Sequence, residues 1–255
     1  MRLRQIALVA HDLEPLATAL HATLGLNVAF RDPGVAVFGL VNVVMPVGGE
    51  FLEIVQPVRD DASAARYLKR RNGDAGYMVI LQDKDALAHR ARLLAAGVRK
   101  IAEHEGRYTF THFHPGDFDG VLTSIDSVGN VADHLVSDSD WPPAGPDWRA
   151  HLSPANVLGL PAVTIQSRDP EAAAKRWAAH LASSVSGKTS VTLTKGEIRF
   201  VPPVDADGTG VIGIDIAVRD AAPVLAAAKT HGLTVSGHGF RICGINISLV
   251  SEFAG

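Results

Sequence analysis

The fold can be predicted from one segment: Ile6-Ala-Leu-Val-Ala-His-Asp12, followed by residues 13–24 and by Gly25-Leu26. Its first part is a short apolar run of the kind that forms a buried strand. Residues 13–24 carry Leu and Ala at helical spacing, and the glycine behind them is a common residue at the end of a helix. The stretch therefore predicts a strand, an aspartate, a helix and a second extended segment.

The same order of features recurs three more times along the chain. The second copy has Tyr77-Met-Val-Ile-Leu-Gln, then Asp83-Lys-Asp85, a helix over 86–96 and Gly97-Val98. The third reads Ala162-Val-Thr-Ile-Gln-Ser-Arg-Asp169, with Pro170 opening a helix to residue 181. The fourth reads Ile214-Asp-Ile-Ala-Val-Arg-Asp220, with a helix over 221–229 and then Gly232-Leu233. Recurrence of this kind indicates a repeated structural unit.

An aspartate precedes each predicted helix, and we interpret these four residues as structural. An aspartate at this position accepts hydrogen bonds from the free N–H groups of the first helical turn and complements the helix dipole. The four are Asp12, Asp85, Asp169 and Asp220.

Short β-rich runs follow the helices, among them residues 35–44, 51–55, 108–114 and 121–125. Each unit is therefore predicted as βαβββ, which gives an α+β fold. Residues 138–154 are rich in Pro, Asp, Ser and Trp and are predicted to link two similar domains, 1–137 and 155–255, of two units each. We expect the pocket in the N-terminal domain.

The composition is that of an ordinary globular protein. The 255 residues are 47% hydrophobic and 20% charged, with a net charge of -3. A nucleic-acid partner is not expected, because such binding needs a basic face. The first residues hold too few apolar side chains for a signal peptide or a membrane span. The single cysteine, Cys243, excludes an intrachain disulfide, and a cytoplasmic location is expected.

Two stretches carry a resemblance to a known family. Gly39-Leu-Val-Asn42-Val-Val-Met-Pro-Val-Gly-Gly-Glu-Phe-Leu-Glu53-Ile-Val resembles the Asn…Tyr-Leu-Glu block of glyoxalase-like proteins. Phe110-Thr-His-Phe-His114-Pro-Gly-Asp-Phe-Asp-Gly120-Val-Leu resembles the His-Pro-x-Asp-x-x-Gly-Val-Leu turn of epimerases. Together with the βαβββ units, they make the chain similar to the vicinal oxygen chelate superfamily, which includes glyoxalases, methylmalonyl-CoA epimerases, extradiol dioxygenases and bleomycin-resistance proteins.

The resemblance implies two glyoxalase-like domains whose mixed sheets curve into cups. In that superfamily a divalent metal is held by the first and last strands of each unit, and the matching positions here are Gln5, Glu53, Tyr77 and Ser124. Only one of these is anionic at neutral pH, whereas divalent metals prefer carboxylate and imidazole ligands. A divalent metal (Zn, Mn, Fe, Ni or Co) and no metal at all are equally compatible with this set. The matching C-terminal positions fall near Ala162, Arg199 and Ile214, so we expect that half to be degenerate.

Three side chains are the candidate catalytic residues: Glu53, His112 and Tyr77. A carboxylate in an otherwise apolar strand needs a partner, a proton or a metal, although strand alternation alone is compatible with Glu53 facing solvent. His112 offers acid–base chemistry near neutral pH and, with Glu53 and Gln5, is a candidate metal ligand. The alternative for His112 is a half-buried surface position, and for Tyr77 an ordinary core aromatic.

Four further residues are candidates for substrate binding: Gln5, Asn42, His114 and Ser124. Three of them also have a structural alternative, since Gln5 is compatible with a strand edge, and Asn42 and His114 with turns.

Two hypotheses of function remain open from the sequence. The first is an enzyme with lyase or isomerase chemistry on a small carbonyl or enolisable metabolite. The resemblance favours these two classes over dioxygenase chemistry. The second is a non-catalytic protein that sequesters a small molecule. In both, the partner is a small molecule and the protein is a monomer or a homodimer.

Overall fold

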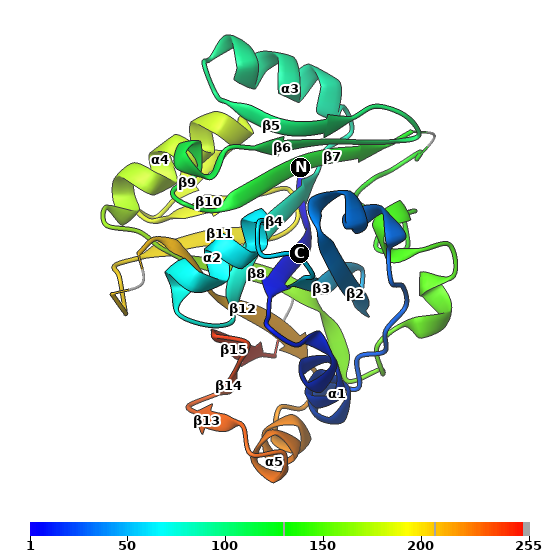
Figure 1. Cartoon of the computed structure of the whole chain (residues 1–255). Coiled ribbons are helices and arrows are strands. Elements are labelled where there is room, and N and C mark those ends of the chain that lie inside the picture. Colours follow the sequence, from blue (N-terminus) through cyan, green and yellow to red (C-terminus); the bar gives the residue numbers. More distant parts are fainter. Residues whose placement is uncertain (130, 207, 252–255) are drawn as a thin grey trace.

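The computed structural model describes residues 1–129, 131–206 and 208–251, whose strands form two mixed sheets (Figure 1). The seven-stranded sheet has the order β2-β3-β1-β4-β7-β6-β5. Its strands are β1 (Arg2–Val9), β2 (Leu40–Val47), β3 (Glu50–Pro57), β4 (Ala75–Gln82), β5 (Lys100–His104), β6 (Tyr108–Phe113) and β7 (Leu122–Val128).

The eight-stranded sheet has the order β13-β14-β15-β12-β8-β11-β10-β9. Its strands are β8 (Val157–Gln166), β9 (Ser184–Ser186), β10 (Ser190–Thr192), β11 (Glu197–Val201), β12 (Gly210–Val218), β13 (Thr234–Ser236), β14 (Gly239–Ile242) and β15 (Ile245–Val250). In both sheets the first strand of one unit pairs antiparallel with the first strand of the other, β1 with β4 and β8 with β12. The predicted α+β fold with two curved mixed sheets is confirmed.

Five α-helices occur in the described residues: α1 (Leu13–Leu24), α2 (Ser63–Arg71), α3 (Ala86–Ala95), α4 (Pro170–Leu181) and α5 (Ala222–Thr230). α3 lies against β6 and β7, α4 against β9 to β11, and α1 packs beside α5 (Figure 1). None of these helices is long and apolar enough to cross a membrane.

The four aspartates predicted to precede helices accept hydrogen bonds from the first turns of those helices. Asp12, Asp85 and Asp169 accept hydrogen bonds from backbone N–H groups of α1, α3 and α4, and Asp220 accepts one from Ala222 of α5. Gly25 closes α1 at a φ of 69°, a left-handed conformation that glycine adopts without strain. The helical part of the repeat therefore forms as its sequence dictates.

The first unit departs from the repeat at residues 35–38, which the sequence predicted as strand. They belong to η1 (Pro33–Phe38), a short 3-10 helix. The Asp32 carboxylate accepts the Gly34 N–H at 2.8 Å, and Pro33 stands in the first turn, so the local contacts favour a helical turn over a strand. An isolated bridge between Phe30 and Val44 stands where the other units have a strand.

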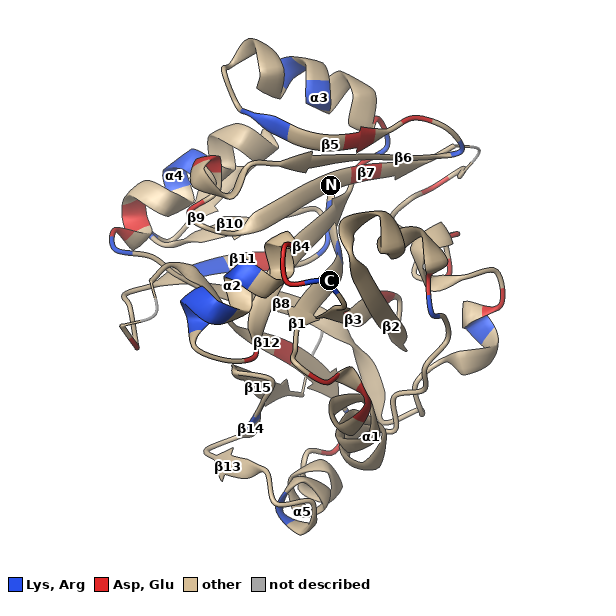
Figure 2. Cartoon of the chain, viewed as in Figure 1, with Lys and Arg blue, Asp and Glu red and all other residues tan. Residues whose placement is uncertain are grey.

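The helix α2 was not predicted, because it lies between two units and its residues do not repeat elsewhere. Its exposed face carries Arg66, Lys69 and Arg70, and most charged residues of the protein likewise lie in helices and connections rather than in the central strands (Figure 2).

Two apolar clusters divide the interior. One joins one face of the seven-stranded sheet to the eight-stranded sheet and to helices of both halves. The other lies on the opposite face of the seven-stranded sheet and includes Ala7, Val44, Phe51 and Tyr77. Residues 138–154, predicted as a linker, contribute the buried Trp141 and Trp148 to this second cluster. These indoles therefore belong to the face that holds the cavity described next.

Candidate active site

A cavity of about 930 Å³ lies over the second apolar cluster. Strands β1, β3, β4 and β6 supply its floor and one wall, while η1 and the first residues of α2 close another side. The lining is predominantly apolar and aromatic, with a small number of polar side chains, which is the usual character of a small-molecule site. Four of those polar side chains were candidates from the sequence: Gln5, Glu53, Tyr77 and His112.

Glu53 lies on the cavity face of β3. Alternation along the strand places Phe51, Glu53 and Val55 on the same side, and the first and last of these belong to the second apolar cluster. Only 6% of Glu53 is exposed, so the alternative that this carboxylate faces bulk solvent is excluded.

Two carboxamides hold the Glu53 carboxylate. Gln5 Nε2 donates to one oxygen at 2.8 Å and Asn42 Nδ2 donates to the other at 2.6 Å. Burial raises the pKa of Glu53, and the two donated hydrogen bonds, which favour the ionised form, oppose that effect only in part. The site therefore holds an oriented carboxyl group whose proton affinity is higher than that of an ordinary glutamate.

The orientation of each carboxamide is fixed from behind. Trp141 Nε1 donates to Gln5 Oε1 at 2.7 Å, and the backbone N–H of Asp32 donates to Asn42 Oδ1 at 2.8 Å. Turning the Gln5 amide by 180° would place its oxygen against the carboxylate and its N–H against the indole N–H. Trp141 thus determines which end of Gln5 meets Glu53.

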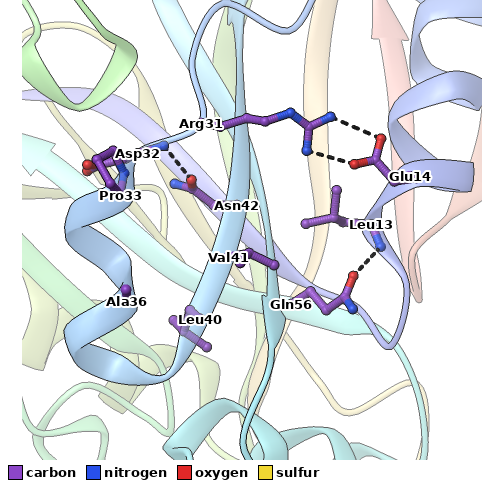
Figure 3. A pocket seen from close by; sticks show the side chains of 10 residues that line it. All are labelled: Leu13, Glu14, Arg31, Asp32, Pro33, Ala36, Leu40, Val41, Asn42 and Gln56. Atoms are coloured by element: carbon purple, nitrogen blue, oxygen red, sulfur yellow. Dashed lines mark hydrogen bonds and ion pairs between the residues drawn. The ribbon is translucent and has the colours of Figure 1, made fainter.

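Asn42 also borders a second, smaller cavity of about 320 Å³, which shares Asp32 and Leu40 with the larger one (Figure 3). Arg31 and Glu14 form an exposed ion pair at its rim, with 2.7 Å between Arg31 Nη1 and Glu14 Oε1. Asn42 lines this smaller cavity and not the larger one, so its link to the larger cavity is the hydrogen bond to Glu53.

Tyr77 lies on β4 with 9% of its surface exposed. Its ring meets Tyr67 of α2 edge-on at 5.2 Å between centroids, and its hydroxyl lacks a hydrogen-bond partner among the described residues. Burial raises the pKa of Tyr77 to about 12, so the phenol keeps its proton at neutral pH. It can therefore donate a hydrogen bond to a ligand oxygen.

His112 lies on β6, on the same face as Tyr108 and Phe110. Its imidazole stacks on Phe110 at 4.5 Å and packs against Phe38 at 5.7 Å between ring centroids. Burial lowers the pKa of His112 to about 4, so the ring is neutral at neutral pH. His112 is thus half-buried, as its structural alternative had it, and the ring forms part of the cavity wall.

His114 and Ser124 do not line the cavity. His114 precedes the short helix η2 (Pro115–Asp117), where its Nδ1 accepts the Gly116 N–H at 3.0 Å. The Ser124 hydroxyl donates to Asp126 and also lies 3.2 Å from the Thr111 carbonyl oxygen. The structure thus brings together four of the predicted site residues and leaves these two in structural contacts.

Sequence reasoning missed Asp126 and Tyr108. Asp126 lies on β7 and is completely buried, and the Tyr108 hydroxyl donates to it at 2.5 Å. Burial raises the pKa of Asp126 to about 7, despite the hydrogen bonds from Ser124 and Tyr108. The available signal was an aspartate inside a strand two residues beyond Ser124, on the same face by alternation.

The residues at the superfamily's metal positions do not fit a divalent ion. Both Glu53 oxygens accept amide N–H groups, and the Gln5 oxygen that would face a metal accepts the Trp141 N–H. Within residues 1–129, 131–206 and 208–251, no three His, Cys, Asp or Glu side chains are grouped to hold a metal ion. In the C-terminal half, Arg199 binds Asp215 at 2.7 Å, which places a cation at a ligand position.

Comparison with known proteins identifies similar sequences and folds. The family model described as a glyoxalase-like domain matches residues 6–181. An ethylmalonyl-CoA/methylmalonyl-CoA epimerase from Cereibacter sphaeroides is 29% identical over 138 residues, covering 50% of this chain and 98% of the relative.

Two solved structures show how much of the chain is similar in fold. A mutant 4-hydroxymandelate synthase from Streptomyces coelicolor matches with a TM-score of 0.67 and 18% identity, over 91% of this chain and 75% of that one. The methylmalonyl-CoA epimerase of Mycobacterium tuberculosis matches with a TM-score of 0.46 and 21% identity, over 50% of this chain and 87% of that one. The synthase match therefore extends the fold similarity over both sheets.

Proposed function

The chain belongs to the glyoxalase-like domain family, and from this premise we propose that its larger cavity is the active site of a lyase or isomerase. The substrate class is a small carbonyl or enolisable metabolite, and Glu53 is the group that moves its proton. The observation that carries the proposal is a buried carboxyl group at the floor of an apolar cavity, oriented by two carboxamides.

Proton removal beside a carbonyl requires a base and a means of stabilising the enolate oxygen. Glu53 supplies the base, and its raised pKa brings its proton affinity closer to that of the reacting group. The Tyr77 hydroxyl supplies a neutral donor in the same cavity, and the neutral His112 ring adds a second polar contact without a buried charge. No step in this proposal passes through a metal.

The epimerase relative supports the isomerase class. That relative is named as an epimerase of ethylmalonyl-CoA and methylmalonyl-CoA. The identity of 29% extends over 138 residues, which is 50% of this chain. An acyl thioester is therefore one member of the substrate class to be tried.

The test is solvent deuterium incorporation at the carbon beside the carbonyl, followed by NMR. The probes are pyruvate, 2-oxobutyrate, dihydroxyacetone and methylmalonyl-CoA. We expect the wild-type protein to exchange at least one probe, and Glu53→Gln to lower that rate by about 10²- to 10⁴-fold, the usual contribution of a general base.

Glu171→Gln is the matched control, because it makes the same chemical change as Glu53→Gln but at an exposed residue of α4. This variant should exchange at the wild-type rate. Exchange that survives in Glu53→Gln, or that is absent from the wild type with every probe, would contradict the proposal.

The alternative function is a protein that sequesters a small molecule. It is favoured by the cavity wall of neighbouring rings, in which His112 stacks on Phe110 and lies tilted against Phe38, because such a wall suits a flat ligand. For a sequestering protein, Glu53→Ala should retain much of the ligand affinity and no variant should change a reaction rate. If the protein is an enzyme, the same substitution should abolish turnover.

A further inference from the structure

Tyr108 and Asp126 form a second acid–base pair in the cavity. Tyr108 lines the cavity from β6, and its hydroxyl donates to a carboxylate oxygen of Asp126 at 2.5 Å. Asp126 lies on the adjacent strand β7, is completely buried and does not reach the cavity itself. The tyrosine hydroxyl therefore links the Asp126 carboxyl group to the cavity.

This pair lies across the cavity from Glu53. The strands β3 and β6 are separated by β1, β4 and β7, which in a flat sheet would place them about 19 Å apart. Yet Trp141 meets the Tyr108 ring edge-on at 5.6 Å and also donates to Gln5, which holds Glu53. The sheet therefore curls, and the two acid–base groups belong to different walls of one cavity.

The surroundings of Asp126 are suited to a group that gains and loses a proton. The Ser124 hydroxyl donates to one carboxylate oxygen and the Tyr108 hydroxyl to the other, and the Thr111 backbone N–H also favours the ionised form. When Asp126 is protonated, its own O–H can donate to the Tyr108 oxygen. The tyrosine hydroxyl is then free to turn towards the cavity.

We infer that Tyr108 is a second catalytic acid of the proposed reaction and that Asp126 recharges it. The inference rests on the proposed function, because it needs an enolate produced by Glu53. The Tyr108 O–H bond breaks as its proton bonds to the enolate carbon or oxygen, and the Asp126 proton moves to the tyrosine oxygen in the same step. Substrate gains one proton, Asp126 loses one, and tyrosine ends unchanged.

The first test is a carboxyl titration of protein labelled with ¹³C at aspartate. The Asp126 resonance, assigned by its loss in Asp126→Asn, should titrate near pH 7. In Tyr108→Phe the midpoint should move higher, because the ionised carboxylate loses a donor. An Asp126 that stays ionised from pH 5 to 9 would overturn the inference regardless of any activity.

The second test separates the two acid–base groups with whichever of dihydroxyacetone and methylmalonyl-CoA exchanges faster in the wild type, because these two probes have an isomeric product. In Tyr108→Phe, deuterium exchange by Glu53 should continue while formation of the isomerised product falls by about 10²-fold or more. Product formation in the wild type should decrease above about pH 7, and this decrease should vanish in Asp126→Asn. Both substitutions keep the shape of the residue, so thermal unfolding serves as the control for folding.

The outcomes distinguish this inference from the proposed function. Loss of both exchange and product in Glu53→Gln, with loss of product alone in Tyr108→Phe, supports both. Unchanged product formation in Tyr108→Phe overturns the role of Tyr108 and leaves Glu53 in place. If the wild-type protein exchanges none of the probes, the proposed function is contradicted, and so is the role of Tyr108 that rests on it.

Discussion

Trp141 and Gln5 lie 136 residues apart in the chain and are joined by a hydrogen bond of 2.7 Å from the indole N–H to the amide oxygen. Because Gln5 Nε2 then faces Glu53, a residue beyond the last strand of the seven-stranded sheet sets the orientation of a carboxyl group on β3. The segment 138–154 therefore completes the cavity and does more than connect the two sheets.

Replacing Trp141 by Phe should destabilise the protein more than replacing Trp148 by Phe. Both indoles are buried against Phe51, but the Trp148 N–H lacks a partner among the described residues. Trp141→Phe leaves the Gln5 oxygen buried and unpaired, which costs about 1–3 kcal/mol beyond the loss of packing. Urea unfolding of the two variants measures the difference, and equal losses would show that the Trp141–Gln5 bond contributes nothing.

Asp126 should make the protein less stable as pH rises. Its pKa is near 7 in the folded state and near the ordinary value of 3.8 in the unfolded state. Between these values the folded protein binds more protons, so the free energy of unfolding falls with increasing pH, by at most about 1.4 kcal/mol per unit. Asp126→Asn should remove this slope between about pH 4 and 7, as followed by urea unfolding.

Asp117 provides a control, because its effect on the pH dependence of stability has the opposite sign to that of Asp126. The hydrogen bonds from Arg99 lower the pKa of Asp117, so this residue contributes stability that is lost as pH falls through its folded-state pKa. Asp117→Asn should leave the slope between pH 4 and 7 intact. A wild-type protein without that slope would contradict the burial of an uncharged Asp126.

His112 should stay neutral over the range in which an ordinary histidine titrates. Its pKa of about 4 lies below the ordinary 6.5, so the unfolded state binds more protons between these values and stability is lost as pH falls through that window. The imidazole resonance, assigned by its loss in His112→Phe, should not move between pH 5.5 and 8 in the NMR spectrum. A midpoint near 6.5 would show that the ring is hydrated and outside the wall of the cavity.

A chelator should leave both stability and proton exchange unchanged. The Glu53 oxygens and the Gln5 oxygen already accept N–H groups, so a divalent ion would have to displace three hydrogen bonds to bind there. We expect the melting temperature with EDTA to match that with added Zn²⁺ or Mn²⁺. About one equivalent of metal in the purified protein, lost in Glu53→Ala, would contradict this.

The sequence predicts the helices well because their signals are local. Leu13–Leu24 and Pro170–Leu181 form at the expected residues, since an aspartate and the spacing of apolar residues define each. The strand expected at 35–38 was wrong because the Asp32 side chain and Pro33 favour a turn. The apolar character of those residues reflects the cavity wall and not a strand.

The candidate site was predicted in part. Glu53 was identifiable because a carboxylate in an apolar strand is unusual, and the family resemblance placed it in the pocket. Its partners were not identifiable as such, because the bonds from Asn42 and the support from Trp141 depend on how distant segments fold together. Tyr108 was missed because tyrosine is common in strands, and Asp126, although an aspartate is uncommon in a strand, was missed because its contact with Tyr108 depends on how β6 pairs with β7.

The central claim is that Glu53 is a protonatable carboxyl group inside the cavity, and a ¹³C NMR titration of the glutamate carboxyl carbons tests it without knowledge of the substrate. We predict that the resonance lost in Glu53→Gln titrates at a pH above the range of the other glutamates, because burial raises its pKa. A Glu53 that titrates with or below the exposed glutamates would contradict the account, since it would be an ordinary carboxylate held by its hydrogen bonds.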